Sequence, residues 1–384
     1  MAWVAGRRSR SAPPIKRGTI GWRDAARAGS PAGMRIVFVL TYPTHHGIAD
    51  VGEWLRWDNR DRRMPGILAE LGAEVELWGL AKEPLDTVSA LPGIAPYPIR
   101  LFAPCNPQAR TRDQKSDAMI VAAKTDPATL FVLIGSNGGA GFDLYDRVLR
   151  PDKRRFAVVI GGDWWSRIVP RAAFVFPESA VQEAKLTQPG WRMWRRAVPD
   201  ALMLRLAKTI DTDRFAPVEA EKRFDVIATS RLTPYKRFDE IGALSEAHRV
   251  AVLGDGPQAA ALRRRFPQVE WLGHVPNAQV PAMLAQARLF FHAGRRDYFP
   301  RAIPEAMACG LPVAAFDDRI GPDVIPPECG LLVRDADYRA QVAALLADPA
   351  ALAAMGAAAR AHAVATHGAR SSEAACRRLM ELAA

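Results

Sequence analysis

The chain has 384 residues, of which 49% are hydrophobic and 24% charged, which is ordinary for a soluble globular protein with room for two domains. No stretch approaches the roughly 18 consecutive apolar residues of a membrane span. The four cysteines have no CxxC or metal-ligand spacing and no HExxH pattern occurs, which argues against a disulfide framework and against a metal site. We expect reduced thiols in a cytoplasmic protein.

The net charge of +11 is concentrated near the N-terminus. Residues 1–33 hold seven Lys or Arg against one acid, Asp24, and are rich in Gly, Pro and Ser. This composition predicts a disordered basic tail, and no apolar core of a secretory signal is present in it. We expect the natural start at Met34; a tail that touches acidic partners is the alternative. Nucleic-acid binding would depend on this tail alone, and we do not expect it.

Residues 34–205 predict a first α/β domain. The run MRIVFVL over 34–40 predicts a buried parallel strand, followed by a turn-rich loop, an amphipathic helix through about Leu71 and a strand over 73–80. An opening of this kind favours a doubly wound sheet. Further strands are predicted over 130–134, 156–160 and 173–176.

The segment from Gly190 to Lys208 interleaves tryptophans with arginines. The ordinary interpretation is a basic surface turn whose tryptophans pack on the domain. The alternative is a surface that rests on a membrane interface or on an anionic acceptor. Pro199 interrupts the pattern and argues against a continuous membrane helix.

A second α/β series begins after a predicted boundary near 206–222. Strands are predicted over 224–229, 249–253, 269–272, 288–292 and 313–316, with helices between them. Ala-rich helices are expected over 337–346, 350–366 and 371–384. We therefore expect a second domain over 206–365 and a C-terminal helix, 366–384, that crosses back to the first domain.

The stretch from Phe290 to Pro312 combines an apolar strand end, a charged turn and a helix over 302–308. Two acids, Asp297 and Glu305, stand eight residues apart in it. A loop at the carboxyl end of a strand is where α/β sheets bind ligands, and the N–H groups that open a helix attract anions. An acid near a helix start is also an ordinary cap or dipole partner.

Two cations follow the strand over 224–229. Arg231 and Lys236 therefore lie in a loop at the carboxyl end of a parallel strand, where an Arg fork and a Lys ammonium suit a diphosphate. Two solvated surface cations are the alternative. The turn from Gly254 to Pro257 follows the next strand and is uninformative alone.

These parts occur in a familiar order. Residues 211–217 (DTDRFAP), 230–236 (SRL…K), 254–257 (GDGP) and 272–276 (LGHVP) precede an acid-x7-Glu pair and the run EAMACGLPV over 305–313. The whole resembles retaining glycosyltransferases of the GT-B fold, family four, also called group 1 glycosyl transferases. The resemblance is close over about 206–335 and weaker over 34–205. It implies an α/β protein of two Rossmann-like, doubly wound domains that face a cleft.

The resemblance also implies roles for single residues. Arg231 and Lys236 would bind the donor's diphosphate and serve catalysis. Glu305 would hold the ribose hydroxyls. Asp297 would be a catalytic residue that lies by the donor sugar. Relatives usually have Glu there, and the shorter aspartate leaves the sugar preference open.

Other donor-side residues lie in the loops around these. Gly254 is expected to contact the donor. Between the two acids, relatives use small residues that bring backbone N–H groups to the phosphates. Here Pro300 removes one donor, Arg301 adds a cation, and Ala302 opens the helix. We therefore expect a phosphate contact that is partly made by side chains.

In the first domain, relatives place a Gly-rich loop after the first strand, near the donor phosphates. The segment from Thr44 to Ile48 stands there with one glycine, Gly47, flanked by His45 and His46. Relatives also place a His after a mid-domain strand, where this chain has Asn137 and Asp163 in comparable loops. We treat these two residues and the two histidines as acceptor-side candidates; a loop aspartate is as often a simple cap.

The sequence predicts a glycosyltransferase that moves a sugar from a nucleotide diphosphate sugar to a glycan, lipid-linked or small-molecule acceptor. Fixed cations would stabilise the leaving diphosphate without a metal or other cofactor. We read the DTD of 211–213 as a linker turn rather than a metal site. The alternatives are a GT-B epimerase or phosphorylase and a non-catalytic nucleotide-binding subunit. Contact with the inner membrane face stays an open alternative to a purely cytoplasmic protein.

Overall fold

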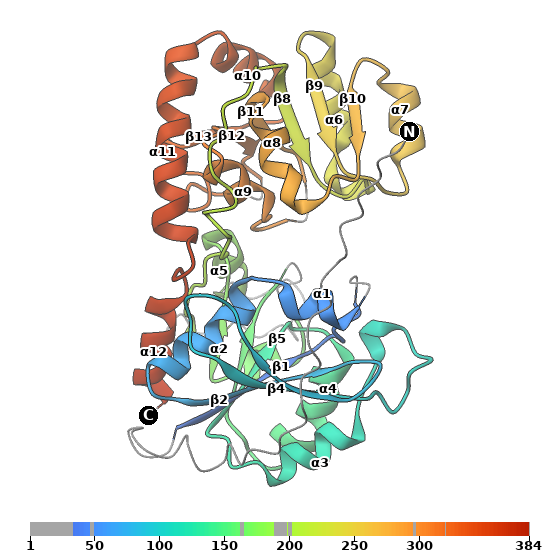
Figure 1. Ribbon diagram of the computed structural model, residues 1–384, viewed down its shortest axis with the longest axis vertical. Helices are drawn as coiled ribbons and strands as arrows, with labels where there is room; N and C mark the ends of the chain where they lie inside the picture. The colour runs from blue at the N-terminus through green and yellow to red at the C-terminus, as the bar shows by residue number, and fades with distance from the viewer. Residues whose placement is uncertain are drawn as a thin grey trace, which may run out of the picture.

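The computed structural model describes residues 34–46, 50–161, 165–187, 198, 202–294, 297–318 and 320–383. This part of the chain forms two α/β units, each a sheet between layers of helices, stacked along the long axis of the molecule (Figure 1). The predicted class, an α/β protein with two doubly wound sheets, is confirmed.

The first sheet has the strand order β3-β4-β2-β1-β5-β6-β7 in the described residues. Every neighbouring pair is parallel except β3 and β4, which are antiparallel. The strands are β1 (Arg35–Leu40), β2 (Glu74–Leu80), β3 (Leu85–Ser89), β4 (Tyr97–Phe102), β5 (Leu130–Ile134), β6 (Phe156–Val159) and β7 (Phe174–Phe176).

Most helices of this unit begin at short polar residues that cap them. Asp50 accepts a bond from the Glu53 N–H at 2.8 Å, and Ser116 opens its helix in the same way. Such caps satisfy N–H groups that have no partner within the helix. The helices are α1 (Val51–Arg56), α2 (Arg60–Glu70), α3 (Asp117–Thr125), α4 (Gly139–Leu144) and α5 (Ala180–Thr187).

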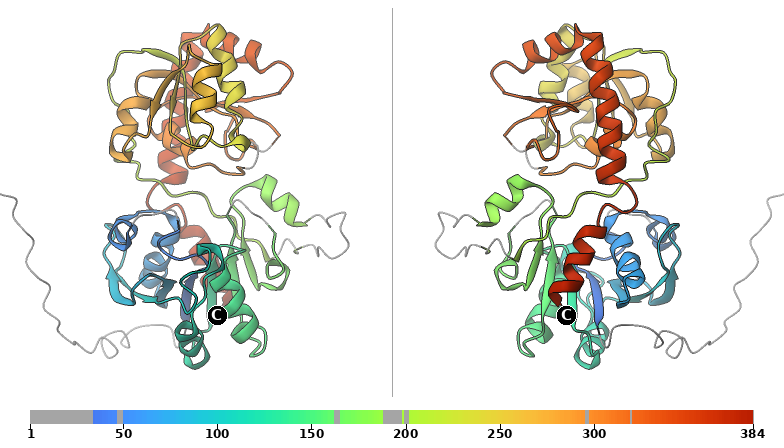
Figure 2. Two further views of the ribbon diagram at one scale, coloured as in Figure 1. Left: turned by 90° about the vertical axis from the view of Figure 1, so that its right-hand side faces the viewer. Right: turned by 90° about the vertical axis from the view of Figure 1, so that its left-hand side faces the viewer.

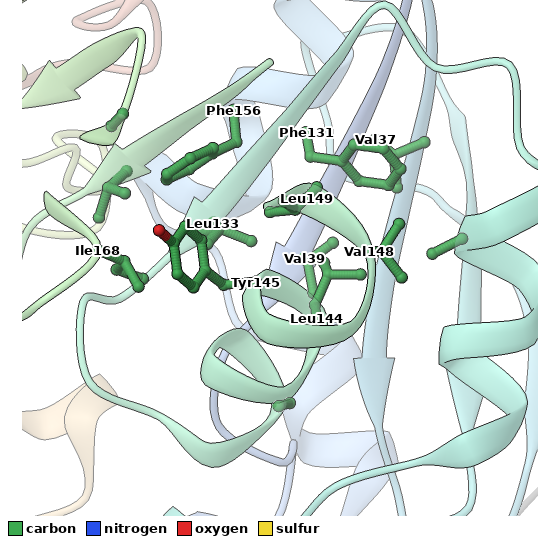
Figure 3. Packing of buried hydrophobic residues seen from close by; sticks show 14 of the residues in the cluster. Val37, Val39, Phe131, Leu133, Leu144, Tyr145, Val148, Leu149, Phe156 and Ile168 are labelled. Carbon is green, nitrogen blue, oxygen red and sulfur yellow. The ribbon is translucent and has the colours of Figure 1, made fainter. Parts of the chain in front are cut away.

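Alternate residues of β1 enter two separate cores, because successive side chains of a strand point to opposite faces. Val37 and Val39 pack with Phe131 and Leu144 on one face (Figure 3). Phe38 packs on the other face, in a cluster that α2 covers. Both faces of the sheet are therefore buried, which explains the continuous apolar run of this strand.

The second sheet has the order β10-β9-β8-β11-β12-β13 in the described residues, and all its pairs are parallel. Its strands are β8 (Phe224–Thr229), β9 (Val250–Leu253), β10 (Glu270–Gly273), β11 (Ala287–His292), β12 (Val313–Phe316) and β13 (Gly330–Val333). Its helices are α6 (Phe238–Ala243), α7 (Ala259–Arg265), α8 (Val280–Leu284), α9 (Ala302–Ala308), α10 (Tyr338–Leu346) and α11 (Pro349–His367).

Some elements differ from the sequence prediction. The single helix expected before Leu71 is two helices, α1 and α2, since Asn59 starts a new one by accepting a bond from the Arg62 N–H. The strands β3, β4 and β13 and the helix α3 were not predicted. The expected tail over 1–33 and most of the Trp/Arg segment lie outside the described residues.

The last helix, α12 (Glu373–Ala383), packs against α2, and its Cys376 and Leu379 enter a core of the first unit. Figure 2 shows the chain descending from α11, beside the second sheet, to α12 beside the first. Near this crossing the linker that leads into the second unit runs alongside. The Ile210 N–H donates to the His367 carbonyl at 2.9 Å, and the hydroxyls of Thr209 and Ser371 lie 2.5 Å apart.

Within the described residues, no single helix is long and apolar enough to cross a bilayer. The pair α10 and α11 reaches that length and composition only when taken together, with a 96° bend between the two helices.

Candidate functional site

Two loops meet at the carboxyl edge of the second sheet. Strands β8 and β11 are parallel neighbours, so the loops that follow them emerge side by side. Lys236, in the loop after β8, forms an ion pair with Oδ2 of Asp297, in the loop after β11. The structure thus brings together two of the three predicted catalytic residues, which are 61 positions apart in the sequence.

A third residue, His292, completes this cluster. It is the last residue of β11, it is 4% exposed, and its Nε2 lies 3.4 Å from Oδ2 of Asp297. The sequence analysis did not single it out. The available signal was a polar residue closing an apolar strand just before the predicted catalytic turn.

The cluster favours an ionised Asp297. Burial acts to raise the pKa of this carboxyl, but the neighbouring His292 imidazole and the Lys236 ammonium outweigh it and lower the pKa to about 2. Burial lowers the pKa of His292 below its ordinary value, which favours a neutral imidazole at pH 7. The site therefore presents a fixed negative charge beside a fixed positive charge.

Arg231 and Gly254 line a neighbouring cavity of about 420 Å³ at the ends of β8, β9 and β10. Arg231 is exposed and has no ion pair within the described part of the chain. The same cavity is lined by Asp255, His274 and Val275. His274 belongs to the quoted LGHVP run but received no role from the sequence. A cavity of this size, open to solvent beside an arginine, is suited to part of a nucleotide.

The backbone at Gly254 packs directly against the backbone of Ser230 at the wall of this cavity. Its φ is +129°, and a Cβ there would lie 1.9 Å from the Ser230 carbonyl oxygen. Only glycine fits this backbone conformation and this approach. The glycine therefore shapes the cavity, whatever contact it makes with a ligand.

We expect Gly254→Ala to destabilise the protein by about 3 kcal/mol, because it combines backbone strain with a clash against an immobile carbonyl. Gly93→Ala is the matched control, since Gly93 also has a positive φ, +73°, but nothing lies within 4 Å of an added Cβ. Urea unfolding measures both. Equal losses in the two variants would contradict the close approach at Gly254.

Glu305 lies in the first turn of α9, and its side chain is 12% exposed. Its Oε1 is 3.4 Å from Nε of Arg301, four residues earlier. Burial raises the pKa of Glu305 even though Arg301 opposes the shift. Pro300 precedes the helix and accepts a bond from the Ile303 N–H at 3.2 Å, while Ala302 is its first residue. The predicted donor-side residues 300–302 and 305 thus form one turn.

In the first unit, two of the acceptor-side candidates lie on one polar cluster. Asn137 accepts a bond from the Tyr42 hydroxyl at 2.5 Å, and the Tyr42 ring lies 4.6 Å from the ring of His46. Nδ1 of His46 is 2.6 Å from the Thr111 hydroxyl. The cluster follows β1 and β5, so it lies at the carboxyl edge of the first sheet. Tyr42 and Thr111 are members that the sequence analysis did not name.

The remaining candidates are not joined to either cluster by a contact described above. For His45, burial lowers the pKa of the imidazole below its ordinary value. Gly47 and Asp163 lie outside the described residues. Asp211 Oδ1 accepts bonds from the N–H groups of Asp213 and Arg214, which is a linker turn. Among the described residues, no group of three or more His, Cys, Asp or Glu is placed to hold a metal ion.

Comparison with known proteins supports the second unit most directly. Residues 224–348 match the family model described as "Glycosyl transferases group 1". A GDP-mannose-dependent alpha-mannosyltransferase of Mycobacterium tuberculosis is 30% identical over 150 residues, which are 35% of this chain and 39% of the relative. A GDP-mannose-dependent alpha-(1-6)-phosphatidylinositol monomannoside mannosyltransferase of Mycolicibacterium smegmatis is 33% identical over 197 residues, or 42% of this chain and 52% of the relative. The matches thus span about half or less of these relatives.

The fold extends over nearly the whole chain. A sucrose-phosphate synthase from Thermosynechococcus elongatus superposes with a TM-score of 0.66 over 91% of this chain and 98% of its own, at 17% identity. At that identity the likeness concerns the fold alone, and the fold is GT-B. The chain therefore has the two-domain GT-B fold, and residues 224–348 of its second domain match the group 1 glycosyl transferases.

Proposed function

We propose that this chain transfers a sugar from a nucleoside diphosphate sugar to a hydroxyl of a glycan, lipid-linked or small-molecule acceptor. The observation that carries the proposal is the ion pair between Lys236 and Asp297, with Arg231 in the same loop as Lys236, inside the segment that matches the family. Because the matched relatives are named as GDP-mannose-dependent, GDP-mannose is the first donor to test.

The geometry supports separate roles for the residues that would bind the donor. Arg231 and Lys236 would hold the diphosphate and stabilise the charge that develops on it as the bond to the sugar breaks. Asp297, ionised because its pKa is about 2, would accept hydrogen bonds from sugar hydroxyls. Glu305 would accept bonds from the ribose hydroxyls.

We further propose that transfer needs no metal and retains the configuration of the sugar. The support for the first is that the loop after β8 offers two side-chain cations, Arg231 and Lys236, which could stabilise a leaving diphosphate. The support for the second is the resemblance to retaining relatives. Turnover in excess EDTA and the anomeric configuration of the product test these two points.

The acceptor would bind to the first domain, at the polar cluster of Tyr42, His46 and Asn137. This cluster offers a hydroxyl, an imidazole and an amide, which suit a polyhydroxyl ligand. An acceptor held on one domain and a donor held on the other gain proximity when the domains close. Screening of glycan, lipid-linked and small-molecule acceptors would identify the acceptor.

The proposal predicts that one nucleoside diphosphate will raise the melting temperature of the wild type. At about 100 times its dissociation constant, a ligand stabilises by roughly 2.7 kcal/mol. A thermal-shift panel of GDP, UDP, ADP and TDP, with their common sugars, is the measurement. We expect Glu305→Ala to lose the shift, since it removes the predicted ribose contact, and Glu219→Ala, an exposed linker carboxylate, to keep it.

If no nucleotide shifts the folded wild type, the proposal fails. If GDP binds but GDP release from GDP-mannose is not seen with any acceptor, the chain is better described as a nucleotide-binding subunit. Loss of the shift in Glu219→Ala as well would indicate a general effect of charge rather than a site.

A further inference from the structure

A buried imidazole lies beneath the proposed sugar site. His292 ends the apolar strand β11, whose preceding residues Leu289, Phe290 and Phe291 are fully buried. A polar atom in such a place is costly unless it is paired, by about 1–3 kcal/mol. In the described structure, Nε2 of His292 is buried and makes no hydrogen bond. Its position needs a reason other than packing.

The atom that Nε2 approaches is a charged one. It lies 3.4 Å from Oδ2 of Asp297, the same oxygen that pairs with Lys236. That separation is longer than an ordinary hydrogen bond by about half an ångström. Catalytic hydrogen bonds in ligand-free enzymes are often long and tighten when substrate binds. A small movement of the carboxylate would therefore complete the contact.

The absence of a side chain at Gly294 leaves space for the contact between His292 and Asp297. A Cβ at Gly294 would lie 2.6 Å from Oδ2 of Asp297 and 2.8 Å from Nε2 of His292. Any larger residue at this position would push into both partners. The absence of a side chain at Gly294 therefore lets the carboxylate sit directly over the imidazole.

We propose that His292 is a positioning residue for the donor sugar, whose Nε2–H holds the Asp297 carboxylate in place while Lys236 engages the diphosphate. The inference rests on the proposed transfer from a nucleoside diphosphate sugar. The Lys236 ammonium has three N–H donors, and some of them would point to phosphate oxygens once the donor is bound. Asp297 would then receive fewer hydrogen bonds from Lys236. The imidazole then keeps the carboxylate fixed and ionised, so that it can accept bonds from sugar hydroxyls.

The test separates the sugar contact from the nucleotide contact. His292→Leu removes the donor and keeps an apolar side chain, while His292→Gln keeps an amide nitrogen as far from the backbone as Nε2. His248→Leu, at a histidine outside the site, is the matched control. Calorimetry gives the affinities for GDP and for GDP-mannose, and steady-state kinetics gives kcat.

We expect His292→Leu to lose about tenfold or more in kcat and in the preference for GDP-mannose over GDP, because a hydrogen bond to a charged group is lost. Its affinity for GDP itself should stay within about twofold, since the diphosphate and ribose contacts remain. His292→Gln should recover most of the loss, and His248→Leu should match the wild type. A merely structural role would lower GDP affinity, kcat and melting temperature together, and glutamine would not restore them.

A ligand-free readout keeps the inference testable even if no nucleotide binds and the proposed function fails. The contact predicts that His292→Leu and Asp297→Asn are coupled in urea unfolding, so that the double variant is destabilised by less than the sum of the single ones. Additive losses would overturn the inference. So would wild-type sugar preference and turnover in His292→Leu.

Discussion

Lys236→Ala is expected to lower sugar transfer by about 100-fold or more and to abolish the thermal shift given by the nucleoside diphosphate. Lys236 is the cation that the fold pairs with Asp297, and we propose that it also binds the diphosphate. Removal of one fixed group that stabilises charge in a transition state costs about 100- to 1,000-fold in kcat. Initial rates of GDP release and the melting temperature with and without GDP measure the two effects.

The variant also leaves Asp297 without its cation. Because the Asp297 side chain is only 22% exposed, some loss of stability is expected alongside the loss of function. The ligand-free melting temperature must therefore be reported with the kinetics. Lys124→Ala, at an exposed position of α3, is the matched control and should behave as the wild type. Undiminished transfer by folded Lys236→Ala would remove this residue from the site.

A second large effect is expected in the dependence of stability on pH, through His367. This residue ends α11, is 1% exposed, and lies with Nδ1 3.0 Å from the Lys208 carbonyl oxygen. Its ring lies 5.3 Å from that of Phe299, in the loop that carries Asp297. Burial, helped by the nearby His362, lowers the pKa of His367 from 6.5 to about 4.

The sign follows from proton binding. Between pH 6.5 and pH 4 the unfolded chain binds a proton on this residue and the folded chain does not, so stability falls as the pH falls through that window. At pH 5 the loss relative to pH 7 is about 2 kcal/mol. Above pH 6.5 the contribution of the neutral imidazole is fully present.

His367→Asn tests this, because an asparagine amide can still donate to the Lys208 carbonyl but does not titrate. We expect the drop in the free energy of unfolding from pH 7 to pH 5 to be smaller in the variant by about 2 kcal/mol. Urea unfolding at the two pH values is the measurement. An identical drop in variant and wild type would show that other groups carry the acid sensitivity.

Much of the fold was predictable because buried parallel strands are continuous apolar runs with abrupt ends. The predicted bounds of β5, β8, α9 and β12 coincide with those observed. The edge of the first sheet was not predictable in this way. In β3 exposed and half-buried residues alternate, since this antiparallel edge strand has one face open to water. The strand β4 contains Pro98, which argues against a strand.

The sequence allowed the residues of the candidate site to be predicted, but not which of them contact one another. Two cations and two acids followed strands, yet the pairing of Lys236 with Asp297 depends on β8 and β11 being neighbours, which local pattern does not determine. His292 was missed because, in sequence, a histidine at the end of an apolar strand resembles any core residue. The need for glycine at 254 is likewise set by the Ser230 carbonyl, which belongs to another strand's loop.

The return of the chain to the first domain has a mechanical consequence. The two domains are joined by two covalent spans, the linker before β8 and the crossing between α11 and α12, and these are held to each other by the Thr209–Ser371 and Ile210–His367 bonds. A single tether would permit swivelling in every direction, whereas two tethers fastened side by side favour rotation about one axis. Beside this joint, the Ala180 N–H donates to Asp323 across the domain boundary at 2.6 Å, and Arg205 of the linker pairs with the same carboxylate. Nζ of Lys185 lies 3.3 Å from the hydroxyl of Tyr298, the residue after Asp297. Rotation about that axis would change these contacts, so the relative orientation of the two domains is coupled to the surroundings of the loop that carries Asp297.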